Sequence, residues 1–116
     1  MRFSKTDNMY KMIRITGSQD NILSVIFDHK NKSDNNIEGI EWDFPNIDKS
    51  RIRTSKEKVL KQVLFGLESI NHSLGTNYKL SKIYFSPFDS ATNSVYNLLT
   101  CKLIRHYHSG NEFKEV

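Results

Sequence analysis

The stretch that decides the fold is residues 82–110, KIYFSPFDSATNSVYNLLTCKLIRHYHSG. It opens on a short β-branched and aromatic run, which is typical of a strand. Pro87 then breaks the pattern, and Ser90 offers an N-cap for a helix that Gly110 ends. The stretch therefore predicts a strand followed by an amphipathic helix. The apolar positions at helical spacing are Val95, Leu98, Leu99 and Leu103.

The preceding segment predicts a second helix. Thr54 and Glu57 fit a capping box at its start, and Gly75 suits a left-handed C-cap. Gly66 lies inside this helix, where it permits close packing. The residues at helical spacing are Leu60, Val63, Leu64, Leu67, Ile70 and Leu74.

Three further strands are predicted upstream, at residues 9–16, 22–28 and 37–44, and Pro45 ends the last of them. A fourth lies within residues 78–85. Alternation places apolar residues on one face of each of the first three strands. These are Met9, Ile13 and Ile15, then Leu23, Val25 and Phe27, then Ile40, Trp42 and Phe44.

The predicted order is βββαβα in a single domain, residues 1–116, with 1–8 and 111–116 expected to be loose. We expect an α+β two-layer sandwich, in which two helices pack on one face of a mainly antiparallel four-stranded sheet. The length is sufficient for one hydrophobic core without disulfides.

Cys101 is the single cysteine, so an intramolecular disulfide and thiolate-rich zinc sites are excluded. The first residues lack the apolar core of a signal peptide, and no run of 18 apolar residues suggests a membrane span. We therefore expect a cytoplasmic protein that does not enter membranes.

The formal net charge of +4 is unevenly spread, and bases concentrate in residues 49–61. Such a segment attracts nucleic acid or an acidic protein surface, or it is simply the solvated start of a helix. The bases are Lys49, Arg51, Arg53, Lys56, Lys58 and Lys61, opposed only by Glu57.

The residue types needed for catalysis are present but do not converge. On a helix, Cys101 and His106 face different directions, and His106 and His108 point apart. Glu41 and Asp43 share a strand face, yet no third ligand for a metal is evident. We therefore expect no enzymatic activity, no cofactor and no metal site. The two carboxylates are expected to face solvent or to form an acidic docking surface.

Three short segments resemble small bacterial immunity proteins of contact-dependent growth inhibition and related polymorphic toxin systems. They are YFSPFDS at residues 84–90, SVY at 94–96 and LIRHYH at 103–108. The resemblance implies a cytoplasmic, non-catalytic protein that binds and neutralises a cognate toxin domain. It carries over no individual binding residue.

Charge indicates where a partner would bind, with exposed aromatic side chains such as Tyr84, Phe88, Tyr96 and Tyr107 adding contact area. The predicted interface comprises Glu38, Glu41, Asp43, Lys49, Arg51, Arg53, Lys56 and Lys58. The alternative is a small nucleic-acid-binding regulator that uses residues 49–61, although no RNP-like, Gly-X-X-Gly or helix-turn-helix pattern is present. The oligomeric state stays open.

Overall fold

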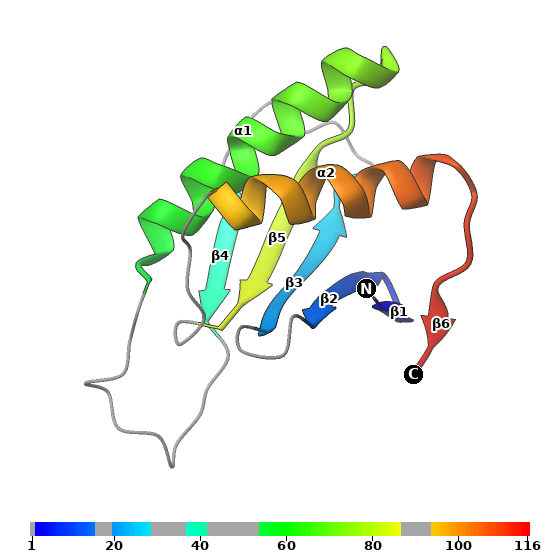
Figure 1. Cartoon of the computed structure of the whole chain (residues 1–116), viewed down its shortest axis with the longest axis horizontal. Coiled ribbons are helices and arrows are strands. Elements are labelled where there is room, and N and C mark those ends of the chain that lie inside the picture. The colour runs from blue at the N-terminus through cyan, green and yellow to red at the C-terminus, as the bar shows by residue number, and fades with distance from the viewer. Residues whose placement is uncertain (1, 16–19, 29–36, 42–53, 87–93) are drawn as a thin grey trace.

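The computed structural model of the chain describes residues 2–15, 20–28, 37–41, 54–86 and 94–116 (Figure 1). Within these residues a sheet forms one layer, and two helices lie side by side over one of its faces. The predicted α+β class is confirmed. The elements are β1 (Arg2–Thr6), β2 (Met9–Ile15), β3 (Asp20–Phe27), β4 (Glu38–Glu41), α1 (Lys56–Leu74), β5 (Leu80–Phe85), α2 (Val95–His108) and β6 (Lys114–Glu115).

The sheet is mixed rather than mainly antiparallel and four-stranded. Its six strands in the described residues follow the order β4-β5-β3-β2-β1-β6. The pairs β1–β2, β2–β3 and β3–β5 are antiparallel, whereas β4 lies parallel to β5 and β6 parallel to β1. β5 lies between β3 and β4, and its Ile83 and Phe85 are fully buried there. The short β4, with its exposed Glu38, suits an edge.

Two segments that we expected to be loose belong to this sheet. β1 pairs with β2 through a tight turn in which Asp7 adopts a φ of 53°, a conformation that Asp tolerates. β6 lies along the other edge of β1, and the amide of Val116 donates to the carbonyl of Lys5 at 3.0 Å. Both segments are mostly polar and show no apolar alternation, so they carry no strand signal in the sequence.

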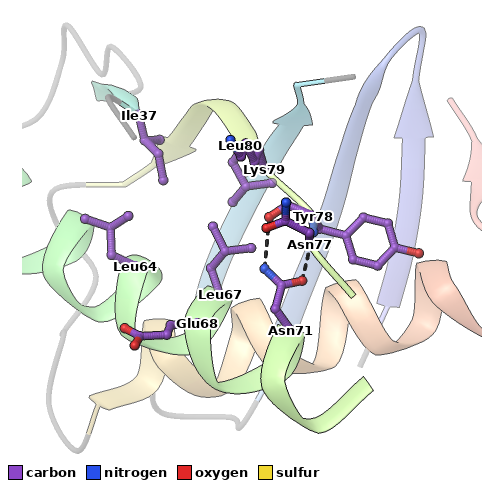
Figure 2. A pocket seen from close by; sticks show the side chains of 9 residues that line it. All are labelled: Ile37, Leu64, Leu67, Glu68, Asn71, Asn77, Tyr78, Lys79 and Leu80. Atoms are coloured by element: carbon purple, nitrogen blue, oxygen red, sulfur yellow. Dashed lines mark hydrogen bonds between the residues drawn. The ribbon is translucent and has the colours of Figure 1, made fainter. Parts of the chain in front are cut away.

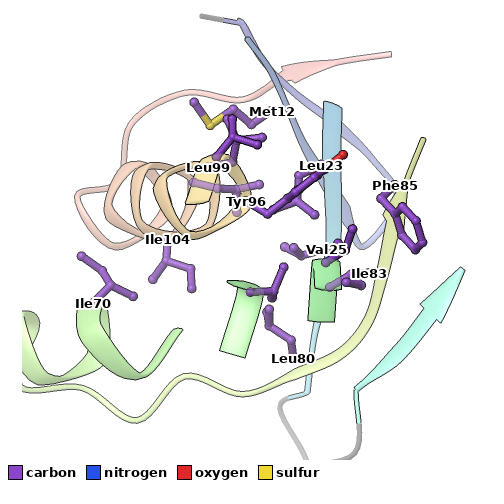
Figure 3. Packing of buried hydrophobic residues seen from close by; sticks show 14 of the residues in the cluster. Met12, Leu23, Val25, Ile70, Leu80, Ile83, Phe85, Tyr96, Leu99 and Ile104 are labelled. Atoms are coloured by element: carbon purple, nitrogen blue, oxygen red, sulfur yellow. The ribbon is translucent and has the colours of Figure 1, made fainter. Parts of the chain in front are cut away.

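One continuous core fills the space between the sheet and the helices (Figure 3). The predicted inward face of β3 is confirmed, since Leu23, Val25 and Phe27 are all buried. The fully or nearly buried hydrophobic residues are Met12, Leu23, Val25, Phe27, Val59, Val63, Ile70, Leu80, Ile83, Phe85, Val95, Tyr96, Leu99, Leu103 and Ile104.

The apolar face identified on β2 is not the face that packs on the helices. Met12 is fully buried towards the helices, whereas Met9 and Ile13 pair with outward residues of β3 and lie on the opposite face. Both faces of β2 carry apolar residues, so alternation alone could not choose between them. On β4, Gly39 faces α1, which places Ile40 on the face opposite the helices.

The two helices pack tightly where Gly66 meets α2. A Cβ added at Gly66 would lie 2.7 Å from the carbonyl oxygen of Asn97. The predicted close packing at this glycine is therefore confirmed. The side chain of Gln62 also crosses between the helices and accepts a hydrogen bond from the amide of Tyr96 at 3.1 Å.

The helix ends follow the sequence signals with small shifts. Ser55, rather than Thr54, is the N-cap of α1, and its hydroxyl accepts from the amide of Lys58 at 3.3 Å. Gly75 caps the other end at a φ of 66°, as predicted. α2 begins at Val95 with Ser94 as N-cap, and the predicted cap Ser90 lies outside the described residues.

Candidate binding surface on the helical layer

Large apolar side chains remain exposed on the two helices. Among the described residues of the two helices these are Leu64, Phe65 and Leu98, which are 40%, 65% and 40% exposed. Gly66 packs on Asn97, so Phe65 and Leu98 are the chain neighbours of two residues that form a close contact between α1 and α2. Burying such a side chain stabilises a complex by roughly 1.5–3 kcal/mol, so exposed neighbours of this kind favour a docking role.

Basic side chains lie near these two residues along the helices. Lys61 and Lys58 lie about one and two turns before Phe65, and both are exposed. Lys102 and Arg105 lie about one and two turns after Leu98, and both are also exposed. We call Phe65, Leu98, Lys58, Lys61, Lys102 and Arg105 the helical surface.

The cations of the helical surface have no acidic partner among the described residues. The single ion pair there joins Lys82 Nζ to Glu38 Oε2 at 3.8 Å, and it lies on the sheet. Along their lengths, α1 and α2 carry five Lys or Arg residues and two Glu residues. Their positive charge is therefore available to an acidic partner.

A depression of about 590 Å³ opens beside Leu98 on the side of α2 that faces the C-terminal residues. Phe3 and Leu98 give it apolar walls, while Lys102 and Arg105 contribute positive charge. Its remaining described lining residues are Cys101, His106, Ser109 and Asn111. No acidic side chain occurs among these described lining residues.

A second cavity of about 470 Å³ lies between α1 and the start of β5 (Figure 2). Asn71 lines this cavity and forms hydrogen bonds with the backbone of Tyr78, another lining residue. The side-chain amide donates to the carbonyl of Tyr78 at 2.9 Å, and its oxygen accepts from the amide of Tyr78 at 2.9 Å. The same oxygen accepts from the hydroxyl of Thr76 at 2.9 Å. This arrangement stabilises the turn after α1.

The predicted charged interface is spread over both faces of the sheet. Glu38 lies on the face opposite the helices, where it contacts Lys82, whereas the stem of Lys56 lies over Gly39 on the helical face. Lys58 belongs to the helical surface. Glu41 forms the last residue of β4, opposite Phe85. Asp43, Lys49, Arg51 and Arg53 lie outside the described residues.

The histidines near the end of α2 do not converge, as predicted. His106 stacks on Phe3 with ring centroids 3.7 Å apart, and its Nε2 donates to the carbonyl of Glu112 at 2.7 Å. His108 instead shares a hydrogen bond of 2.7 Å between its Nδ1 and the hydroxyl of Tyr78. His72 is exposed in the last turn of α1, and His29 lies outside the described residues.

Cys101 is positioned as a packing residue. Its thiol lies 3.4 Å from the carbonyl oxygen of Gly66 and 3.5 Å from Oδ1 of Asn97. Burial raises the pKa of this thiol, and the positive charge of Arg105 offsets only part of that rise. The group is thus kept as a neutral thiol, which is a poor nucleophile.

Aromatic rings fill the end of the core below the last turn of α2. The ring of Tyr107 stacks on Phe27 at 4.4 Å and meets Tyr10 edge-on at 5.0 Å. Burial, followed by the nearby phenols of Tyr10 and Tyr78, raises the pKa of Tyr107, and Lys5 opposes this effect. Tyr107 therefore stays neutral at physiological pH and serves as a packing residue.

The described part of the chain contains no group of three or more His, Cys, Asp or Glu side chains that could hold a metal ion. No helix in that part is sufficiently long and apolar to cross a membrane.

The most exposed aromatic residue of the helices was not identified from the sequence. Tyr96 was expected to be exposed but is fully buried, whereas Phe65 is 65% exposed. The exposure of Phe65 could have been predicted from the helical period, because Phe65 lies about 200° around α1 from the buried Val63. Leu98 was assigned to the buried stripe, but it lies at the margin of that stripe.

Comparison with known proteins adds no family to these observations. No protein-family model, no curated protein and no solved structure matches the chain at a significant level.

Proposed function

We propose that the chain is a non-catalytic protein-binding module, and specifically an immunity protein that binds and neutralises a cognate toxin domain in the cytoplasm. The observation that carries this proposal is Phe65, which is 65% exposed beside the close contact between Gly66 of α1 and Asn97 of α2. An aromatic anchor within a charged rim is the usual composition of a protein interface.

The chemistry of the side chains supports binding over catalysis. The neutral thiol of Cys101 and the divergent rings of His106 and His108 offer no nucleophile–base pair in the described residues. The helical surface instead offers apolar area and unpaired positive charge together. We infer that the partner is an acidic protein surface with apolar side chains at its centre.

The test is co-expression with a toxin encoded beside this gene, followed by binding of the two purified proteins. The proposal expects protection of growth and a one-to-one complex. Phe65→Ser should weaken the complex about 30-fold, equivalent to about 2 kcal/mol. Val116→Ser is the matched control, because Val116 is also an exposed apolar residue but lies at the sheet, where its amide donates to the carbonyl of Lys5.

Absence of both protection and a complex would refute the immunity function. Equal weakening by Phe65→Ser and Val116→Ser would refute the role of the helical surface while leaving the function intact.

The alternative is a nucleic-acid-binding regulator. The exposed Lys56, Lys58 and Lys61 on the first turns of α1 favour it, since they follow a helix N-terminus that attracts phosphates. The nucleic-acid alternative requires that the chain binds mixed oligonucleotides and that its affinity for them falls steeply with salt concentration. This binding should be lost in the Lys58→Glu, Lys61→Glu double variant. Oligonucleotide binding of this kind, without a protein complex, would replace the immunity proposal.

A further inference from the structure

The depression beside Leu98 combines an apolar wall with a positively charged rim. Phe3 reaches it from β1, and Leu98 reaches it from α2. Lys102 and Arg105 follow Leu98 on the same side of the helix at intervals of about one turn. The volume of about 590 Å³ is sufficient for one or two side chains of a partner.

The wall of this depression is held in place before any ligand arrives. The rings of Phe3 and His106 are parallel within 3° at a centroid distance of 3.7 Å. His106 is further fixed by its hydrogen bond to the Glu112 carbonyl, and Phe113 packs edge-on against both rings. A preformed wall lowers the ordering cost of binding.

The positive charge of the rim is not neutralised within the described residues. Neither Lys102 nor Arg105 has a carboxylate within salt-bridge distance there, and none of the described lining residues is acidic. The charge of Arg105 also reaches the thiol of Cys101 in the lining, where it opposes the effect of burial on the thiol pKa. An anion in the depression would therefore be attracted by two cations from one side.

We propose that this depression binds the carboxylate of an Asp or Glu side chain of a protein partner, with a neighbouring apolar side chain packed on Phe3 and Leu98. The guanidinium of Arg105 can hold both carboxylate oxygens, and Lys102 adds a second charge. The proposal rests on the proposed function in that the ligand belongs to a protein. The apolar wall favours such a ligand over a nucleic-acid backbone, whose phosphates are flanked by polar sugars.

The test uses the full chain labelled with nitrogen-15 and titrated with two blocked tripeptides, acetyl-Leu-Glu-Leu-amide and acetyl-Leu-Gln-Leu-amide. The Glu peptide should cause saturable shifts in the amide resonances of Leu98, Lys102 and Arg105. The Gln peptide should bind the wild type at least fivefold more weakly than the Glu peptide does. The Arg105→Gln variant should bind the Glu peptide at least fivefold more weakly than the wild type does. Lys114→Gln is the matched control, because Lys114 is exposed on β6 and does not line the depression.

Several outcomes would overturn the proposal. These are equal responses to the two peptides, an unchanged response in Arg105→Gln, or no response at these residues. A thymidine hexanucleotide that shifts them when the Glu peptide does not would assign the depression to phosphate instead.

The tripeptide test does not need the toxin, so the two proposals fail separately. If the Glu peptide binds but no toxin complex forms, the carboxylate site stands and the immunity function fails. If a toxin complex forms, but Arg105→Gln does not weaken it and the Glu peptide does not shift the amide resonances, the immunity function stands and the carboxylate site fails.

Discussion

Gly66→Ala tests whether the close approach of α1 and α2 holds the helical layer together. The added Cβ would lie 2.7 Å from the carbonyl oxygen of Asn97 and 3.1 Å from its Cα. Both are backbone atoms, so no side-chain rotation relieves the contact. The helices must separate, which loosens the packing of Val63 and Ile70 against the core.

The expected magnitude is a balance of two effects. In an open helix, Gly to Ala stabilises by about 1 kcal/mol, because alanine is the better helix former. Overpacking a well-filled contact costs about 1–3 kcal/mol, and contact with backbone at this distance belongs at the upper end. We therefore expect Gly66→Ala to lower the free energy of unfolding by about 2 kcal/mol.

The assay is urea denaturation followed by circular dichroism, in which this loss lowers the midpoint by about 1 M. Ser69→Ala is the matched control, because Ser69 is exposed on the same helix and its replacement changes only helix propensity. We expect that variant to be at least as stable as the wild type. If Gly66→Ala were also as stable as the wild type, the reasoning about helix spacing would be refuted.

Three further outcomes are expected. Asn71→Ala leaves the amide and carbonyl of Tyr78 without their partner and should cost about 2–3 kcal/mol in urea denaturation; a loss below about 0.5 kcal/mol contradicts this. Cys101 should react more slowly with a disulfide reagent at pH 8 in the folded chain than in urea, since burial raises its pKa; equal rates would show that the thiol is free. The pKa of Tyr107 is raised above its ordinary 10.0, so its contribution to stability is complete below that pH and is lost as the pH rises through the folded value. Tyr107→Phe should therefore lose less stability than the wild type as the pH rises above about 10, and identical losses would exclude this role.

The parts of the fold that could be predicted are those with strong local signals. The alternation of Leu23, Val25 and Phe27 identified the central strand, and Gly75 marked the end of α1. β6 could not be predicted, because it pairs with β1 at the other end of the chain, and β1 was missed because its sequence is mostly polar. The place of β5 between β3 and β4 depends on the same kind of long-range pairing.

The candidate site was only partly predictable. The charge of Lys56 and Lys58 was evident from the sequence, but the structure puts Glu38 on the other side of the sheet. Phe65 was detectable from the helical period of α1. The depression was not, because it combines Phe3 from the first strand with Arg105 from the last helix.

The insertion of β5 between β3 and β4 has a consequence for the kinetics of folding. The hydroxyl of Ser81 donates to the carbonyl of Ile26 across 55 residues of chain, so pairing β3 with β5 closes a long loop. Relative to a hairpin loop of about five residues, this closure costs about 2 kcal/mol more in chain entropy. In the described sheet, β4 lies at the edge and has β5 as its one strand partner, so it joins the sheet only through β5. We therefore expect mutations in β5 to slow refolding and mutations in β4 to speed unfolding instead, as stopped-flow measurements of each variant would reveal.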